Sequence, residues 1–135
     1  MDIPAIAICG IATDEASWQD MPVTRIFVPR GRTIEAMAEA ILAKLPDRFA
    51  LCGHSMGGYV ALQIMRRGGE RVAGLALLST SAAADTAEQK AARTAVIEEA
   101  TDDFAGVAEK LAPAMLSPAS RAVPGLLADT HAMLM

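Results

Sequence analysis

Residues 53–58 read GHSMGG, which fits the pattern G-x-S-x-G and lies between a strand-like run and a helix-like run. Residues 49–52, FALC, have the apolar character of a short buried strand, and residues 59–65, YVALQIM, have helical spacing before two glycines end the run. Ser55 is therefore predicted to occupy a sharp strand-to-helix turn. Because such a turn brings the backbone on its two sides close together, the flanking positions Gly53 and Gly57 must lack side chains.

This arrangement is typical of a nucleophile elbow, in which the serine hydroxyl is presented for attack on a carbonyl carbon. The helix after Ser55 would add free amide groups and the positive end of its dipole beside a developing oxyanion. A glycine-rich turn with an incidental serine is the alternative. The order of strand, turn and helix favours the nucleophile.

The rest of the first 85 residues alternates between strand and helix patterns. Strands are predicted at residues 3–9, 24–28 and 72–78, besides the one that leads into the elbow. A helix is predicted from residue 34 to residue 45, with Thr33 as N-cap and Pro46 as terminator. The predicted fold class is therefore α/β, a short, mostly parallel sheet with helices on both faces and ligands at the carboxyl ends of the strands.

Residues 49–62 resemble the elbow region of the α/β-hydrolase family. Residues 5–10 followed by Trp18 resemble the family's early strand and oxyanion loop, with Cys9 where a histidine is usual. Residues 71–80 resemble the strand after the elbow helix. The polar helical stretch beyond it resembles the start of the family's cap.

At 135 residues and 53% hydrophobic content, the chain is predicted to form one domain. Within it, residues 1–85 would be the α/β core and residues 86–135 a cap-like helical segment. Helices are predicted at residues 87–100, 102–111 and 120–134, with a loop at residues 113–118.

In this architecture the oxyanion hole consists of the amide after the nucleophile and one amide from the loop after the early strand. By position these are the backbone N–H groups of Met56 and Ile11. The resemblance also implies a triad in the order serine, acid, histidine.

The chain holds two histidines, and His54 is inside the elbow, where the family's histidine does not occur. His131 is therefore predicted as the base, and Asp85, which follows the fourth strand, as the acid. Asp129 is only two residues from His131, which puts it on a different helix face. Completion of the site by another chain, activity without a full triad, and no activity all stay open.

The predicted function is a serine hydrolase that cleaves small carboxylic esters through an acyl-enzyme on Ser55. Thioesterase, lactonase and carbon-carbon hydrolase activities stay open within this class. The alternative is a noncatalytic or incomplete α/β-hydrolase module that acts in binding or assembly.

Composition limits the other classes of function. A net charge of −4 without a basic cluster argues against a nucleic acid or an anionic membrane as partner. Neither a leader nor a membrane-spanning run is evident, so a cytoplasmic location is expected. No metal-binding spacing occurs, and no cofactor is expected. The apolar strand at residues 72–78 would lie at a sheet edge, which predicts a homo-oligomer.

Overall fold

The computed structural model describes residues 2–135 and divides the chain into two compact units. The first ends at Ala82, and the second comprises Ala83–Met135. The boundary lies close to the predicted limit between core and cap-like segment at residue 85.

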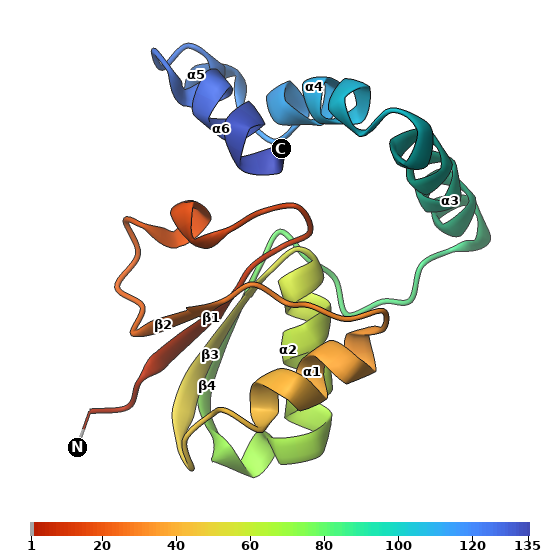
Figure 1. Ribbon diagram of the computed structural model, residues 1–135. Coiled ribbons are helices and arrows are strands. Elements are labelled where there is room, and N and C mark those ends of the chain that lie inside the picture. The colour runs from red at the N-terminus through yellow and green to blue at the C-terminus, as the bar shows by residue number, and fades with distance from the viewer. Residues whose placement is uncertain (1) are drawn as a thin grey trace. The chain divides into compact units, whose positions relative to one another are not determined.

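The first unit is a four-stranded sheet with helices between its strands (Figure 1). Its strand order is β2-β1-β3-β4, and each neighbouring pair is parallel, which confirms the predicted α/β class. Along the chain the elements are β1 (Ala5–Ile8), the 3-10 helix η1 (Glu15–Trp18), β2 (Arg25–Phe27), α1 (Ile34–Leu42), β3 (Phe49–His54), α2 (Met56–Gly68), the 3-10 helix η2 (Gly69–Arg71) and β4 (Val72–Leu78).

Helices α1 and α2 pack on one face of the sheet (Figure 1). Helix α1 begins where predicted, because the Thr33 side chain accepts a hydrogen bond of 3.1 Å from the backbone N–H of Ala36. The core between these helices and the sheet consists of Ile6, Ile8, Ala38, Ile41, Leu45, Phe49, Leu51, Val60, Ala61 and Ile64. This packing fixes the start of α2 against the central strands β1 and β3.

The opposite face carries a smaller cluster under η1 and its flanking loops. Trp18, at the end of η1, packs with Ala7 and Cys9 of the β1 region, and Val23, Ile26 and Cys52 lie against them. The 3-10 helix therefore takes part in covering the second face of the sheet.

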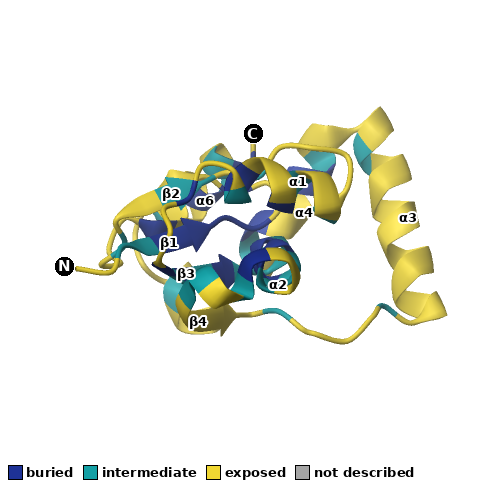
Figure 2. Cartoon of the chain, turned by 90° about the horizontal axis from the view of Figure 1, so that it is seen from below, coloured by how far each residue is buried: buried dark blue, intermediate teal, exposed yellow. Residues whose placement is uncertain are grey.

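Strand β4 lies at the edge of the sheet, as predicted, and most of it is exposed (Figure 2). Leu75 and Leu77 each keep 40% of their surface accessible. The opposite edge strand, β2, has only 3 residues, whereas β4 has 7. Strand β4 is thus the longer unpaired edge, and it carries no charged side chain.

The second unit is helical and comprises α3 (Ala87–Asp102), α4 (Phe104–Ala114), α5 (Pro118–Arg121) and α6 (Leu126–Leu134). Helices α4 and α6 share a small core of Ala108, Ala112 and Leu134. Helix α3 has no buried residue, and it is exposed along nearly its whole length in Figure 2.

The prediction of one helix over residues 120–134 is wrong. The chain breaks between α5 and α6, where Pro124 lacks an N–H and Gly125 adopts a left-handed conformation with φ of 82°. Among residues 2–135, no helix combines the length and apolar character needed to span a membrane.

Candidate active site

Ser55 occupies a strained turn between β3 and α2. Its φ of 51° and ψ of −118° lie outside the regions that non-glycine residues ordinarily adopt. Such a conformation costs about 1–3 kcal/mol and persists only where surrounding contacts enforce it. This is the backbone geometry of a nucleophile elbow.

Hydrogen bonds from three directions hold the turn. The Ser55 N–H donates to the Leu78 carbonyl oxygen at 2.9 Å, which ties the elbow to the end of β4. The Ser55 carbonyl oxygen accepts from the Gly58 N–H at 2.9 Å and from the Thr80 hydroxyl at 2.8 Å. Thr80 is a site residue that the sequence analysis missed, although its place just after the fourth strand is a signal for one.

Gly53 and Gly57 of the elbow must lack side chains because other backbone atoms lie very close to them. A Cβ at Gly53 would lie 2.5 Å from the Gly57 carbonyl oxygen. A Cβ at Gly57 would overlap the carbonyl oxygens of Ile8 and Cys9. The start of α2 therefore lies directly against the end of β1.

The loop after β1 approaches the serine from the other side. A Cβ at Gly10 would lie 3.2 Å from the Cβ of Ser55 and 3.0 Å from Nδ1 of His54. The Thr13 hydroxyl donates to the Gly10 carbonyl oxygen at 3.0 Å and tightens this loop. Ile11, the next residue, keeps 68% of its surface accessible.

Of the two amides predicted for the oxyanion hole, that of Met56 directly follows Ser55 in sequence, and that of Ile11 follows Gly10, which lies close to Ser55. Met56 is the first residue of α2, where a helix has no internal acceptor for its N–H groups. Within residues 2–135, neither the Met56 nor the Ile11 N–H forms a hydrogen bond. The oxyanion role of these amides stays a prediction.

The predicted base and acid lie in the second unit, whereas Ser55 lies in the first. His131 is on α6, and its Nε2 is buried without a hydrogen-bond partner among the described residues. It lines a cavity of about 690 Å³ formed by α4, α5 and α6. The Ser55 hydroxyl forms no hydrogen bond with any described residue of the first unit.

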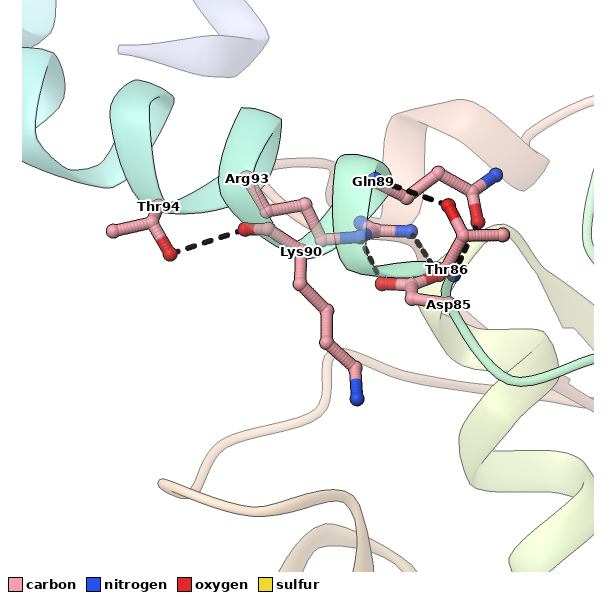
Figure 3. A network of polar contacts seen from close by, with 6 residues as sticks. All are labelled: Asp85, Thr86, Gln89, Lys90, Arg93 and Thr94. Atoms are coloured by element: carbon pink, nitrogen blue, oxygen red, sulfur yellow. Dashed lines mark hydrogen bonds and ion pairs between the residues drawn. The ribbon is translucent and has the colours of Figure 1, made fainter.

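Asp85 forms an ion pair within its own unit (Figure 3). The Nε of Arg93 donates to its Oδ2 at 2.6 Å, and a second guanidinium nitrogen lies 3.4 Å from Oδ1. Next to it, Thr86 and Gln89 form a capping box at the start of α3. The contacts of Asp85 are thus those of a carboxylate that stabilises the start of α3. The triad roles of Asp85 and His131 stay predictions.

A smaller cavity of about 160 Å³ lies within the first unit. Its lining consists of Ser17, Trp18, Met21, His54 and Leu78. Burial raises the pKa of the nearby Cys9 thiol, whose Sγ donates to the Asp14 carbonyl oxygen at 3.3 Å. A thiol held protonated in this way is a poor nucleophile.

The parallel sheet, the strained serine after its central strand and the glycine loop beside it define an α/β-hydrolase. Comparison with known protein families identifies the family within this class. The family model described as Thioesterase domain matches residues 29–133, and the chain belongs to this family.

Curated relatives match a shorter stretch. The pimeloyl-[acyl-carrier protein] methyl ester esterase of Aromatoleum aromaticum is 46% identical over 63 residues, which are 47% of this chain and 25% of that protein. An esterase of the same description from Nitrosomonas europaea is 37% identical over 36% of this chain and 19% of its own. This chain therefore spans a quarter or less of the length of these relatives.

Solved structures match nearly the whole chain. A thermophilic esterase from Thermogutta terrifontis aligns with a TM-score of 0.80 and 26% identity, over 99% of this chain and 58% of that one. This likeness confirms the α/β-hydrolase fold of the chain.

Proposed function

We propose that the chain is a serine hydrolase that cleaves small carboxylic esters through an acyl-enzyme on Ser55. The observation that carries the proposal is the strained Ser55 with φ of 51°, between β3 and the free N-terminus of α2. Strain of this kind is found at functional sites, where surrounding contacts maintain it. The names of the curated relatives, methyl ester esterases, support an alkyl ester as the substrate.

In the proposed reaction the Ser55 Oγ attacks the ester carbonyl carbon, and the N–H groups of Ile11 and Met56 bind the resulting oxyanion. A histidine takes the hydroxyl proton and passes it to the leaving alcohol, which breaks the ester bond. Water then attacks the acyl-enzyme with the same histidine as base and releases the acid. His131 remains the proposed base and Asp85 the proposed acid.

Activity of Ser55→Ala on p-nitrophenyl butyrate tests the proposal. We expect turnover to fall at least about 10³-fold while the far-ultraviolet circular dichroism and the thermal midpoint stay those of the parent, because the change removes only a hydroxyl that forms no hydrogen bond with the described residues of the first unit. Turnover of the parent rate in this variant would refute the serine mechanism.

A noncatalytic module is the second candidate. It is favoured by the lack of a hydrogen bond between His54, the histidine of the first unit, and the Ser55 hydroxyl. Under this alternative the elbow acts as a structural turn. The parent chain would then hydrolyse no ester, and the Ser55→Ala variant would bind the same partners.

We also propose a cytoplasmic location and self-association through the exposed edge of β4. The apolar strand with unpaired backbone groups supports an interface between copies of the chain. A small-molecule ester, with no nucleic acid, membrane, metal or cofactor, completes the proposed set of partners.

A further inference from the structure

Ser79 has a left-handed backbone conformation that residues with a side chain seldom adopt. Its φ is 48°, and among residues 2–135 the other non-glycine residues with a positive φ are Ala12 and Ser55. The Cβ atom crowds the backbone in this region, which nearly excludes β-branched residues, whereas asparagine is found there more often than most. Such a conformation persists where surrounding contacts enforce it, and it is concentrated at functional sites.

The neighbours of Ser79, and not its own side chain, give this conformation a purpose. The residue is exposed, and its hydroxyl forms no hydrogen bond with the described residues of the first unit. The carbonyl oxygen of the preceding residue, Leu78, accepts from the Ser55 N–H at 2.9 Å. The hydroxyl of the following residue, Thr80, donates to the Ser55 carbonyl oxygen at 2.8 Å. Ser79 therefore joins two groups that hold the same residue.

The bend at Ser79 lets both groups reach Ser55. Strand β4 ends at Leu78, which pairs with His54, and the chain turns into α2 directly after Ser55. If Ser79 continued the strand, Thr80 would lie about 7 Å beyond Leu78 along the strand axis, because each extended residue adds about 3.3 Å. The left-handed residue instead returns the Thr80 hydroxyl to the carbonyl oxygen of Ser55.

The side chain of Thr80 has little freedom to compensate for a shift of its backbone. A Cβ at Gly58 would overlap Cγ2 and Oγ1 of Thr80, so this side chain occupies the space that the glycine leaves open in α2. The Gly58 N–H also donates to the Ser55 carbonyl oxygen at 2.9 Å. The Thr80 hydroxyl therefore reaches its acceptor only from the position that the backbone at Ser79 sets.

We propose that Ser79 is a positioning residue, whose left-handed backbone holds the Leu78 carbonyl and the Thr80 hydroxyl as a clamp on Ser55. The inference rests on the proposed ester hydrolysis at Ser55 and adds the residue that maintains the geometry of the nucleophile. The property required at position 79 is the ability to adopt a positive φ. Activity therefore follows that ability, and not the polarity or size of the side chain.

Two substitutions of comparable size separate these effects. Ser79→Asn introduces a residue that tolerates a positive φ, whereas Ser79→Val introduces a β-branched one that resists it. On p-nitrophenyl butyrate, we expect Ser79→Val to lower kcat about tenfold and to leave KM within about twofold of the parent value, because the nucleophile shifts while the substrate site is unchanged. Ser79→Asn and Ser79→Gly should keep kcat within about threefold of the parent.

Ala76→Val is the matched control. Ala76 is an exposed residue of β4, where valine suits the extended backbone, so both kinetic constants should stay those of the parent. A kcat of Ser79→Val within about twofold of the parent value, or an equal loss in Ser79→Asn, overturns the inference.

A double variant tests the route of the effect. In the Thr80→Val background the hydrogen bond from the hydroxyl to Ser55 is already absent, so Ser79→Val should lower kcat by less than about threefold further. Independent effects would multiply instead. A further loss of about tenfold in this background therefore overturns the inference.

If circular dichroism shows that Ser79→Val is unfolded, Ser79→Thr takes its place. Threonine is also β-branched but closer to serine, and we expect a loss of kcat of about threefold relative to Ser79→Asn. Equal kcat in these two variants would then overturn the inference.

Amide hydrogen exchange tests the clamp without catalysis. The Ser55 N–H is protected by its hydrogen bond to Leu78, so its exchange should become about tenfold faster in Ser79→Val and stay that of the parent in Ser79→Asn. If the parent hydrolyses no ester, the proposed function fails, and the exchange rates alone decide whether the clamp exists. Equal rates in the parent and in Ser79→Val refute it.

Discussion

Ser55 keeps its strained backbone through contacts that are distant in sequence. The Thr80 hydroxyl, 25 residues further along the chain, donates to the Ser55 carbonyl oxygen, and the Leu78 carbonyl oxygen accepts the Ser55 N–H. These bonds fix the peptide units on both sides of Ser55. In the proposed mechanism Thr80 is thus a positioning residue, which would act on the reaction through Ser55.

Replacement of Thr80 by valine removes this hydroxyl and keeps the shape of the side chain. We predict a fall in kcat of about tenfold with little change in KM, because the elbow relaxes while the substrate site keeps its walls. The free energy of unfolding should fall by about 1 kcal/mol. Thr80→Ser retains the hydroxyl and should restore kcat; if serine rescues stability but not kcat, the positioning role is wrong.

The identity of the base is tested by the two histidines of the chain. We predict that His131→Ala lowers kcat about 10²- to 10⁴-fold, the usual contribution of a general base. His54→Ala should lower it less, through disturbance of the elbow alone. Parent activity in His131→Ala, measured on p-nitrophenyl butyrate, would remove His131 from the mechanism.

Sequence reasoning located Ser55 because an elbow has a local pattern of glycines at fixed offsets. It missed Thr80, because a hydrogen bond across 25 residues leaves no trace in periodicity and the position after the fourth strand was the one signal for it. The same applies to the ion pair between Asp85 and Arg93, which depends on how the loop before α3 turns back.

At the scale of elements, the close contact between α2 and β1 defines the geometry of the site. A Cβ at Gly57 would overlap the carbonyl oxygens of Ile8 and Cys9. The free amide of Met56, at the start of the same helix, depends on this contact for its position next to the loop after β1. A side chain at residue 57 would force the helix away from the sheet.

Two glycine-to-alanine substitutions distinguish the loss of this close contact from the general effect of replacing a glycine. We predict that Gly57→Ala destabilises the chain by about 3 kcal/mol or more, since the added methyl group meets backbone that cannot yield. Gly74→Ala in β4 meets nothing within 4 Å and should change the free energy of unfolding by less than about 1 kcal/mol. Urea denaturation of both variants measures the difference, and equal stability of the two would contradict the packing argument.

The strands, α1 and α2 were predicted well from the sequence because each has a clear pattern of apolar residues and residues that mark its ends, such as the N-cap Thr33 of α1. It failed between residues 120 and 134, where apolar spacing continues across Pro124 and Gly125. The proline and glycine pair was a sufficient signal for a break. The prediction of a continuous helix followed the helical spacing of the apolar residues and disregarded this signal.

At the scale of the whole molecule, the long edge strand β4 is the main unpaired surface of the first unit. Its 7 residues are apolar and mostly exposed, and it lacks the lysines or prolines that usually protect an edge. Pairing with a second copy would cover the backbone groups and the leucines together.

Light scattering tests the proposed self-association directly. We predict a mass above that of one chain at micromolar concentration, and a shift toward the monomer in Leu77→Lys, because a charge on β4 opposes pairing. Ile97→Lys, at a 66% exposed position on α3, is the control and should leave the mass unchanged. A monomeric parent chain would contradict the proposal.

The central claim is that Ser55 is a reactive nucleophile, and covalent labelling tests it most directly. After treatment with a p-nitrophenyl alkylphosphonate, mass spectrometry of the digested protein should find one phosphonyl group, on the peptide that contains Ser55, with loss of esterase activity in proportion. Ser55→Ala should remain unlabelled. Labelling at another residue, or full ester hydrolysis after treatment with no label on Ser55, would contradict the account.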